Sequence, residues 1–196
     1  YSSNVALVPS TDGAVAFDGS GDYLTVSSSN LPKGSSSRTV EFFVYIQSGY
    51  SSWQNIFSYG SSSSGQCFGI NVGNNDGANI AFTGYSSGDW DTGVSVRGYL
   101  NSWHHFAVTY DGTNVKIFVD GISLGSAARS LNTTGSTFCI GGSEHSGFGE
   151  NFRGIISNFQ VTDNVLYTSN FTPPSAPITS VENTKLLCCK SNSSAT

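Results

Sequence analysis

Aromatic and acidic side chains stand close together in one Gly/Ser-rich stretch of the sequence, GYSSGDWDTG, between Gly84 and Gly93. The flanking glycines and serines predict a loop. Aromatic rings stack on the apolar C–H faces of sugars, and neighbouring carboxylates accept hydrogen bonds from sugar hydroxyls. The pattern therefore predicts a glycan site formed by Tyr85, Asp89, Trp90 and Asp91. The alternative is that Trp90 is a buried anchor that pins the loop, or packs against another subunit.

Asp18 and Asp22 flank a short glycine-bearing turn, DGSGD. Carboxylate oxygens are hard ligands of the kind that Ca²⁺ prefers. The sequence therefore predicts Asp18 and Asp22 as ligands of a structural calcium ion. Because Asp-Gly pairs also form turns without an ion, the alternative is a plain turn. In either case we expect an early hairpin between a strand around Val15–Phe17 and a strand at 23–26.

Acid/base catalysis on a β-sheet needs two carboxylates that share one face at alternate or near-alternate positions. No predicted strand carries such a pair. Glu41 is the only acid of its strand, and a structural partner for a nearby hydrogen-bond donor is its favoured role. Asp89 and Asp91 have the spacing but lie in the predicted loop, which provides no rigid scaffold. We therefore predict that the protein is not an enzyme.

The histidines and cysteines lack the spacing of a metal site. His104 and His105 begin a predicted strand, and His145 stands alone in a loop. Ser and Asp are so frequent in this chain that a Ser/His/Asp grouping is expected by coincidence. Cys67 and Cys139 lie inside predicted strands, where two buried free thiols are favoured over a disulfide.

The elements that must position these residues are strands. In the stretch 103–125 apolar residues alternate in two runs, separated by Asp111-Gly112, and Asp120-Gly121 follows the second run. Asp-Gly pairs tolerate the positive φ angles of tight hairpins, so a meander of three antiparallel strands is predicted. Residues 38–46 carry large side chains at both parities, which predicts a strand near a sheet centre whose second face lines a concavity.

Turn signals recur about every 8–12 residues, as a sandwich requires. We predict an all-β fold, a two-sheet antiparallel β-sandwich with a jelly-roll-like arrangement. One short helical turn is expected within 163–172, ended by Pro173-Pro174. The core is expected to contain Phe42, Val44, Phe106, Val108, Ile117 and Val119.

The chain of 196 residues fits one domain. We predict a domain at 1–172 and a Pro/Ser-containing C-terminal segment at 173–196, with a closing strand at 185–190 and a linker after it. A net charge of −5 disfavours nucleic acid and anionic membrane surfaces as partners. The chain has no Met and begins at Tyr1, which predicts a processed product or a module of a longer polypeptide.

Six segments, taken together in their order and spacing, carry a resemblance to a known family. They are FDGSGDYL at 17–24, TVEFFV at 39–44, WHHFAVTYDG at 103–112, VDG at 119–121, IGG at 140–142 and FRG at 152–154. They resemble the laminin G-like modules of the concanavalin A-like jelly-roll superfamily. The resemblance implies a jelly-roll sandwich, a structural calcium ion near Asp18 and Asp22, and structural roles for Glu41, His104 and His105.

Three segments of the C-terminal part carry a narrower resemblance: GIISNFQV at 154–161, LYTSNFTPP at 166–174 and NTKLLC at 183–188. They are similar to the endings of modules in bacteriophage virion proteins, notably marine ones. Ser157 stands where the commoner secreted modules have an Asp.

This narrower resemblance implies a non-catalytic binding or structural module of a phage virion, in a capsid decoration, tail or fibre. Its partners would be other virion subunits within a larger assembly, together with host-surface glycan. The alternative is an extracellular carbohydrate-binding module of a secreted bacterial enzyme or adhesin.

Overall fold

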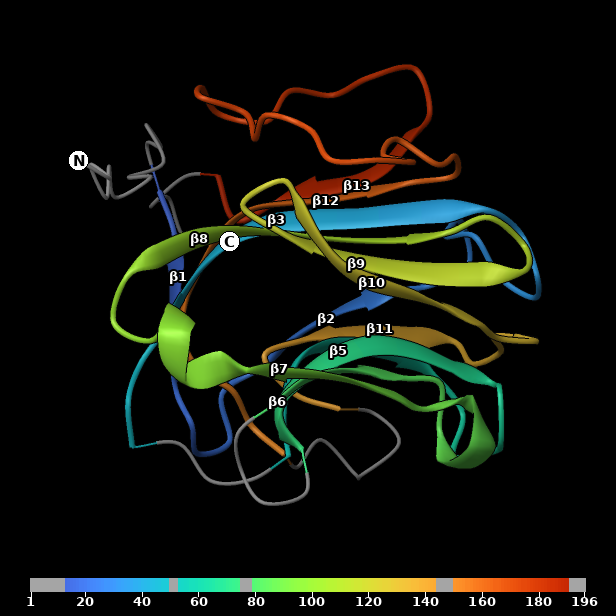
Figure 1. The fold of residues 1–196 in the computed structure, drawn as a ribbon, viewed down its shortest axis with the longest axis horizontal. Coiled ribbons are helices and arrows are strands. Elements are labelled where there is room, and N and C mark those ends of the chain that lie inside the picture. The colour runs from blue at the N-terminus through green and yellow to red at the C-terminus, as the bar shows by residue number, and fades with distance from the viewer. Residues whose placement is uncertain (1–12, 50–52, 75–78, 144–149, 191–196) are drawn as a thin grey trace.

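Two antiparallel sheets packed face to face make up the protein (Figure 1). The computed structural model describes residues 13–49, 53–74, 79–143 and 150–190. One sheet has seven strands in the order β1-β12-β3-β8-β9-β10, with β13 also paired to β12; the other has six, in the order β2-β11-β4-β5-β6-β7. The predicted all-β, two-sheet antiparallel sandwich is confirmed.

The strands of both sheets are short to medium in length. The seven-stranded sheet contains β1 (Val15–Asp18), β3 (Arg38–Ile46), β8 (Trp103–Tyr110), β9 (Asn114–Val119), β10 (Ile122–Ala128), β12 (Arg153–Thr162) and β13 (Thr184–Cys188). The six-stranded sheet contains β2 (Leu24–Ser27), β4 (Gln54–Gly60), β5 (Cys67–Asn74), β6 (Asn79–Thr83), β7 (Trp90–Ser95) and β11 (Thr137–Ile140). The helical elements of the described chain are two single 3-10 turns, η1 (Ser86–Gly88) and η2 (Val96–Tyr99). None of its helices is long and apolar enough to span a membrane.

The meander β8-β9-β10 is confirmed, and its two turns use the predicted residues. Asp111 Oδ1 accepts hydrogen bonds from the backbone amides of Thr113 and Asn114, at 2.8 and 2.6 Å. Asp120 and Gly121 have φ angles of 51° and 75°, the left-handed conformations of a tight hairpin. The turn chemistry of the sequence therefore sets the strand order here.

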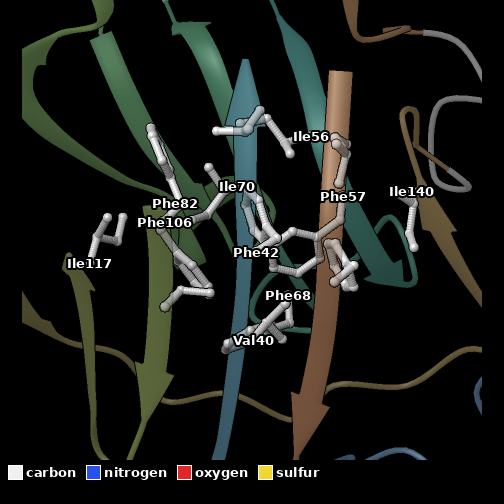
Figure 2. Packing of buried hydrophobic residues seen from close by; sticks show 14 of the residues in the cluster. Val40, Phe42, Ile56, Phe57, Phe68, Ile70, Phe82, Phe106, Ile117 and Ile140 are labelled. Carbon is white, nitrogen blue, oxygen red and sulfur yellow. The ribbon is translucent and has the colours of Figure 1, made fainter. Parts of the chain in front are cut away.

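One aromatic-rich core lies between the sheets (Figure 2). Phe42 of β3 stacks on Phe106 of β8 and on Phe159 of β12, with ring centroids 5.9 and 5.1 Å apart, and meets Phe57 of β4 edge-on. All six residues predicted to share the core are found in it. Burying one such side chain contributes about 1.5–3 kcal/mol, so strands of both sheets are held by the same apolar contacts.

The predicted early hairpin is wrong, because β1 and β2 belong to different sheets. β1 pairs with β12, whereas β2 pairs with β11. The turn between them is an arch over the edge of the sandwich, in which Gly19 and Gly21 have φ angles of 87° and 82°. Alternation along a strand identifies its buried face but not the strand with which it pairs. A turn between two strands that follow each other in the sequence therefore predicts a hairpin even where the two strands join different sheets.

The second face of β3 is mostly covered and is not the open concavity that the sequence predicts, although Glu41 contributes to the lining of a pocket of about 430 Å³ beside the segment after β12. Thr39, Glu41 and Phe43 on this face are almost fully buried. The chain that follows β12 covers it, as the orange-to-red segment above the seven-stranded sheet shows (Figure 1). Leu166 N donates to Thr39 Oγ1 at 2.9 Å, and Tyr167 donates its hydroxyl to Glu41.

The helical turn expected within 163–172 is not formed. Backbone groups of this segment bond to the sheet instead of to one another: Phe171 N donates to Gly121 O at 2.9 Å, and Thr39 Oγ1 donates to Asn164 O at 2.8 Å. Long-range hydrogen bonds to β3 and to the β9–β10 turn therefore outweigh a weak local helical preference.

A strand lies where the closing strand was expected, and β13 pairs with Phe159–Thr162 of β12. β1 pairs with the preceding half of the same strand, at 153–156. Between the two, buried Ser157 Oγ lies 2.8 Å from Gly13 O and 3.3 Å from Cys189 O. The boundary at 172 stays a prediction, and the linker predicted at the end of the chain falls on residues 191–196, outside the described residues.

Candidate functional site

The outer face of the six-stranded sheet carries a row of polar side chains. Strand pairing places Asn55 of β4 beside Asn71 of β5, and Asn71 beside Ala81 of β6. Because side chains alternate along a strand, Asn71 points away from the core that Ile70 enters, and Asn55 points away from the core that Ile56 enters. Phe57 also enters the core, because the pairing of β4 with β5 is irregular between Asn55 and Phe57. The two asparagines are nevertheless only 1% and 3% exposed. They form the floor of a depression.

This depression is an open pocket of about 570 Å³. Its lining consists of Trp53, Asn55, Asn71, Thr83, Tyr85, Ser86, Asp89 and Glu150. Strands β4, β5 and β6 supply the floor. The walls come from the residue before β4, from the turn that contains η1, and from Glu150, which precedes β12. Two aromatic side chains, two amides and two carboxylates thus face one space.

Two amide oxygens in the floor lack hydrogen-bond partners. Among the described residues, neither Oδ1 of Asn55 nor Oδ1 of Asn71 has one. The orientation of Asn55 is fixed, because its Nδ2 donates to Glu150 Oε2 at 2.5 Å. An acceptor left buried and unbonded costs about 1–3 kcal/mol. A ligand that brings hydrogen-bond donors would remove this cost.

Four residues of the lining have left-handed backbone conformations. The φ angles of Trp53, Tyr85, Ser86 and Glu150 are 64°, 68°, 55° and 55°. Such conformations cost about 1 kcal/mol or more in non-glycine residues and cluster at functional sites. Asp89 stabilises one of them, since its Oδ1 accepts hydrogen bonds from Tyr85 N at 2.7 Å and Gly84 N at 3.0 Å.

Burial dominates the electrostatics of the pocket. It raises the pKa of Glu150, while the hydrogen bond from Asn55 opposes the rise and the nearby charge of Asp89 adds to it.

Outside the pocket, burial raises the pKa of the Cys67 thiol to about 12. Cys67 and Cys139 are both buried and form no disulfide in the described chain, which agrees with the favoured prediction of buried thiols.

The structure brings two of the four predicted ligand residues into this pocket, Tyr85 and Asp89. The expectation of one loop through Gly93 is wrong, because β7 begins at Trp90. Trp90 pairs opposite Phe82, packs partly buried against the core and approaches Gly125 of β10. Asp91 accepts hydrogen bonds from Asn79 Nδ2 and Gly93 N. Neither residue is part of the lining.

Sequence reasoning missed Trp53, Asn55, Asn71 and Glu150. One signal exists for Asn71, which stands at the outward parity of β5, while Phe68, Ile70 and Val72 at the other parity are in the core. Asn55 shares the parity of the core residues Phe57 and Tyr59, and it faces outward because the strand pairing is irregular between Asn55 and Phe57. An amide that is buried at such a position needs a partner. Nothing local marks Trp53 or Glu150, because their place in the pocket depends on how separate loops meet.

The predicted calcium ligands hold the arch between β1 and β2. Asp18 Oδ1 accepts from Ser20 N at 2.7 Å, and Asp22 Oδ2 accepts from Asp18 N at 3.3 Å. In the part of the chain that the structure describes, no three acidic, histidine or cysteine side chains lie together as a metal site would require. This donor set fits a turn better than the six to eight oxygens of Ca²⁺. Calcium at Asp18 and Asp22 stays a prediction.

Glu41 has the structural role predicted for it. His105 Nε2 lies 3.1 Å from Glu41 Oε2, and the Tyr167 hydroxyl donates to the same oxygen at 2.7 Å. Burial, reinforced by Glu41, raises the pKa of Tyr167, so its hydroxyl stays a donor. All three side chains lie beneath or within the covering segment.

A Ser/His/Asp grouping does occur in the structure. Ser102 Oγ is 2.7 Å from His104 Nε2, and His104 Nδ1 is 2.7 Å from Asp120 Oδ2. The second oxygen of Asp120 accepts from His105 N at 2.9 Å. Neither Ser102 nor His104 lines the pocket. The grouping ties the start of β8 to the β9–β10 turn.

The strand order of the two sheets and a polar pocket on an outer sheet face define a lectin-like jelly roll. The chain belongs to the concanavalin A-like lectin/glucanases superfamily, whose laminin G-type model matches residues 18–170, more than half of its length. Comparison with curated protein sequences gives no significant match.

Solved structures with this fold include carbohydrate-binding proteins. A proposed carbohydrate-binding protein from Bacteroides ovatus has a TM-score of 0.71 and 16% identity, and this chain, aligned over 93% of its length, spans 52% of that protein. A sialidase module from Ruminococcus gnavus bound to α2,3-sialyllactose has a TM-score of 0.59 and 16% identity, covering 79% of this chain and 92% of that one. Domain 4 of an arabinanase from Geobacillus stearothermophilus, in complex with arabinotriose, has a TM-score of 0.58 and 16% identity, covering 79% and 72%.

Proposed function

We propose that the protein is a non-catalytic carbohydrate-binding module whose site is the pocket on the six-stranded sheet. One observation carries the proposal: two buried amide oxygens without partners lie in a pocket that also contains two aromatic side chains. Sugars combine hydroxyl donors with apolar C–H faces, and this lining is complementary to both. Neighbouring folds that hold sialyllactose and arabinotriose support the same class of ligand.

The binding mode follows from the position of each group. Trp53 is 38% exposed at the wall and offers its ring to a sugar face, as does Tyr85 from the other wall. Asn55 and Asn71 accept hydroxyl hydrogens from the floor. Because the floor is built on strands and η1 is held by Asp89, the site is largely formed before a ligand arrives.

A screen on a glycan array followed by calorimetry tests the proposal. We expect Trp53→Ala to weaken binding about three- to tenfold, as a lost stacking contact of about 0.5–1.5 kcal/mol would. Tyr23→Ala, which removes an exposed aromatic ring outside the lining, is the matched control and should bind as the wild type does. Binding that is indifferent to Trp53→Ala but lost in Tyr23→Ala would move the site elsewhere.

The pocket contains two carboxylates, so the absence of catalysis needs its own test. Asp89 is engaged by three donors, from residues 83, 84 and 85, and Glu150 accepts from Asn55. Both therefore have positioning roles, and we expect no new reducing ends when the protein is incubated with glucans, arabinans or galactans. Turnover that Glu150→Gln abolishes would contradict this part of the proposal.

A place in a bacteriophage virion, with other virion subunits as partners, stays a prediction. It rests on the resemblance of 154–161, 166–174 and 183–188 to virion modules. The solved structures that share the fold support the alternative, a carbohydrate-binding module of a secreted enzyme or adhesin, better than they support the virion role. The genes that flank the coding sequence distinguish the two, since virion genes favour the first and a hydrolase or adhesin the second.

A further inference from the structure

The buried polar atoms in the pocket floor that have no hydrogen bond among the described residues are acceptors. Asn55 and Asn71 each present an unbonded Oδ1, and Asp89 and Glu150 add carboxylates. The Thr83 hydroxyl lies 3.2 Å from Asp89 Oδ1 and donates to it. A ligand that fills this space must therefore bring hydrogen-bond donors of its own.

The charged side chains in the described part of the lining have one sign. Asp89 and Glu150 are its carboxylates, and its described residues include no Lys, Arg or His. Arg129 is not part of this lining, and its guanidinium donates to the backbone oxygen of Asp89 at 2.8 Å. A ligand carboxylate would meet two like charges among the described residues, and it would bring only further acceptors.

We propose that this pocket selects neutral, hydroxyl-rich sugars and rejects sugars that carry a carboxylate, such as sialic and uronic acids. Sugar hydroxyls donate directly to Asn55 Oδ1 and Asn71 Oδ1, without a bridging cation. The inference rests on the proposed function and specifies which class of sugar the site binds. It separates this chain from the sialidase module that shares its fold and holds sialyllactose.

Matched pairs of sugars test the selection on the unaltered protein. Calorimetry compares lactose with sialyllactose, and a galactan with polygalacturonate, at neutral pH. We expect the neutral member to bind at least about tenfold more tightly, the ratio that corresponds to about 1.4 kcal/mol. Equal or tighter binding of the acidic member would overturn the inference and leave the proposed function intact, whereas failure of every sugar to bind would remove both.

Variants and a chelator test the two parts of the proposed selection, direct hydrogen bonding to the asparagine oxygens and repulsion of a ligand carboxylate by the pocket carboxylates. Asn71→Ala should weaken binding of the neutral sugar about three- to tenfold, the effect of one lost hydrogen bond. Glu150→Gln should narrow the preference for the neutral member severalfold, because one repelling charge is gone. Binding should be unchanged in a chelator, and its loss there would overturn direct donation in favour of a bridging cation. Circular dichroism and thermal melts verify that each variant is folded, and the comparison of sugars on the wild type stands without them.

Discussion

Phe106 is the residue whose packing reports most directly on the core. It is fully buried, stacks on Phe42 and lies edge-on to Tyr99, with ring centroids 5.9 and 6.5 Å apart. We expect Phe106→Ala to lower the free energy of unfolding by about 3–5 kcal/mol. Denaturant melts measure it, and Phe106→Leu, which keeps most of the volume, should lose much less. A loss under about 1 kcal/mol for the alanine variant would mean that the ring does not fill the core.

Glu150 links the pocket to the pH dependence of stability. Its pKa is raised in the folded state, mainly by burial, so its ionised form opposes folding at pH values above the folded-state pKa. This cost disappears as the pH falls below the unfolded-state pKa, where both states are protonated. Glu150→Gln should therefore raise the melting temperature at neutral pH and leave it unchanged at strongly acidic pH.

The expected result is a gain in melting temperature at neutral pH that is absent at strongly acidic pH, because Gln keeps an oxygen that can accept from Asn55 Nδ2. An equal gain in melting temperature at both pH values would indicate that removal of a buried charge is not the cause.

At the scale of elements, the segment after β12 acts as a cover for the seven-stranded sheet. Tyr167 stacks on Phe171, and the ring of Phe171 lies edge-on to His105 and Phe118. Tyr167→Phe keeps these contacts and removes only the hydrogen bond to buried Glu41. We expect a loss of about 1.5–3 kcal/mol in denaturant melts, the range for a hydrogen bond to a charged group.

The matched control is Tyr45→Phe, because the hydroxyl of Tyr45 has no hydrogen bond among the described residues. If both variants lost the same stability, the hydrogen bond to Glu41 would not be what holds the cover.

The arch at 18–22 is the second element with a direct test. A calcium ion bound only by the folded protein would raise the melting temperature with its concentration. The prediction of calcium at Asp18 and Asp22 requires a shift between calcium and chelator that Asp22→Ala abolishes. A melt that does not respond leaves the arch as a turn held by hydrogen bonds from backbone amides to the carboxylates of Asp18 and Asp22.

Local chemistry decided how much of each element could be predicted. The meander β8-β9-β10 follows from alternation and two Asp-Gly turns, so all of its information lies within adjacent residues. The arch between β1 and β2 has the same turn residues, yet its strands join different sheets. The start of β7 at Trp90 was hidden by glycines and serines on both sides. Pairing partners depend on distant segments, which local patterns do not specify.

The candidate site is a property of the whole molecule. Asn55 and Asn71 meet through strand pairing, and Glu150 reaches them from about 80 to 95 positions further along the chain. Tyr85 and Asp89 could be found because aromatic and acidic residues cluster within one short stretch. The floor could not, since the outward position of Asn71 does not reveal its neighbours across the sheet, and the pairing irregularity that turns Asn55 outward has no local mark.

The two outer faces of the sandwich differ in how far the chain itself covers them. The segment between β12 and β13 lies over the seven-stranded sheet, and Glu41 and His105 are buried beneath it (Figure 1). The six-stranded sheet has its pocket open on the opposite side. We therefore expect the ligand in the open pocket of the six-stranded sheet.

The shared contact of Ser157 with Gly13 and Cys189 has a consequence for protein engineering. One hydroxyl lies within 3.3 Å of both carbonyl oxygens, so the described chain enters and leaves the sandwich at neighbouring points beside β12. A short linker from Lys190 to Gly13 would close the backbone into a ring without crossing the pocket. Circular permutants with new ends at the exposed Ser62–Ser63 loop should then fold and retain the ligand, which would make the module easy to insert into a host protein.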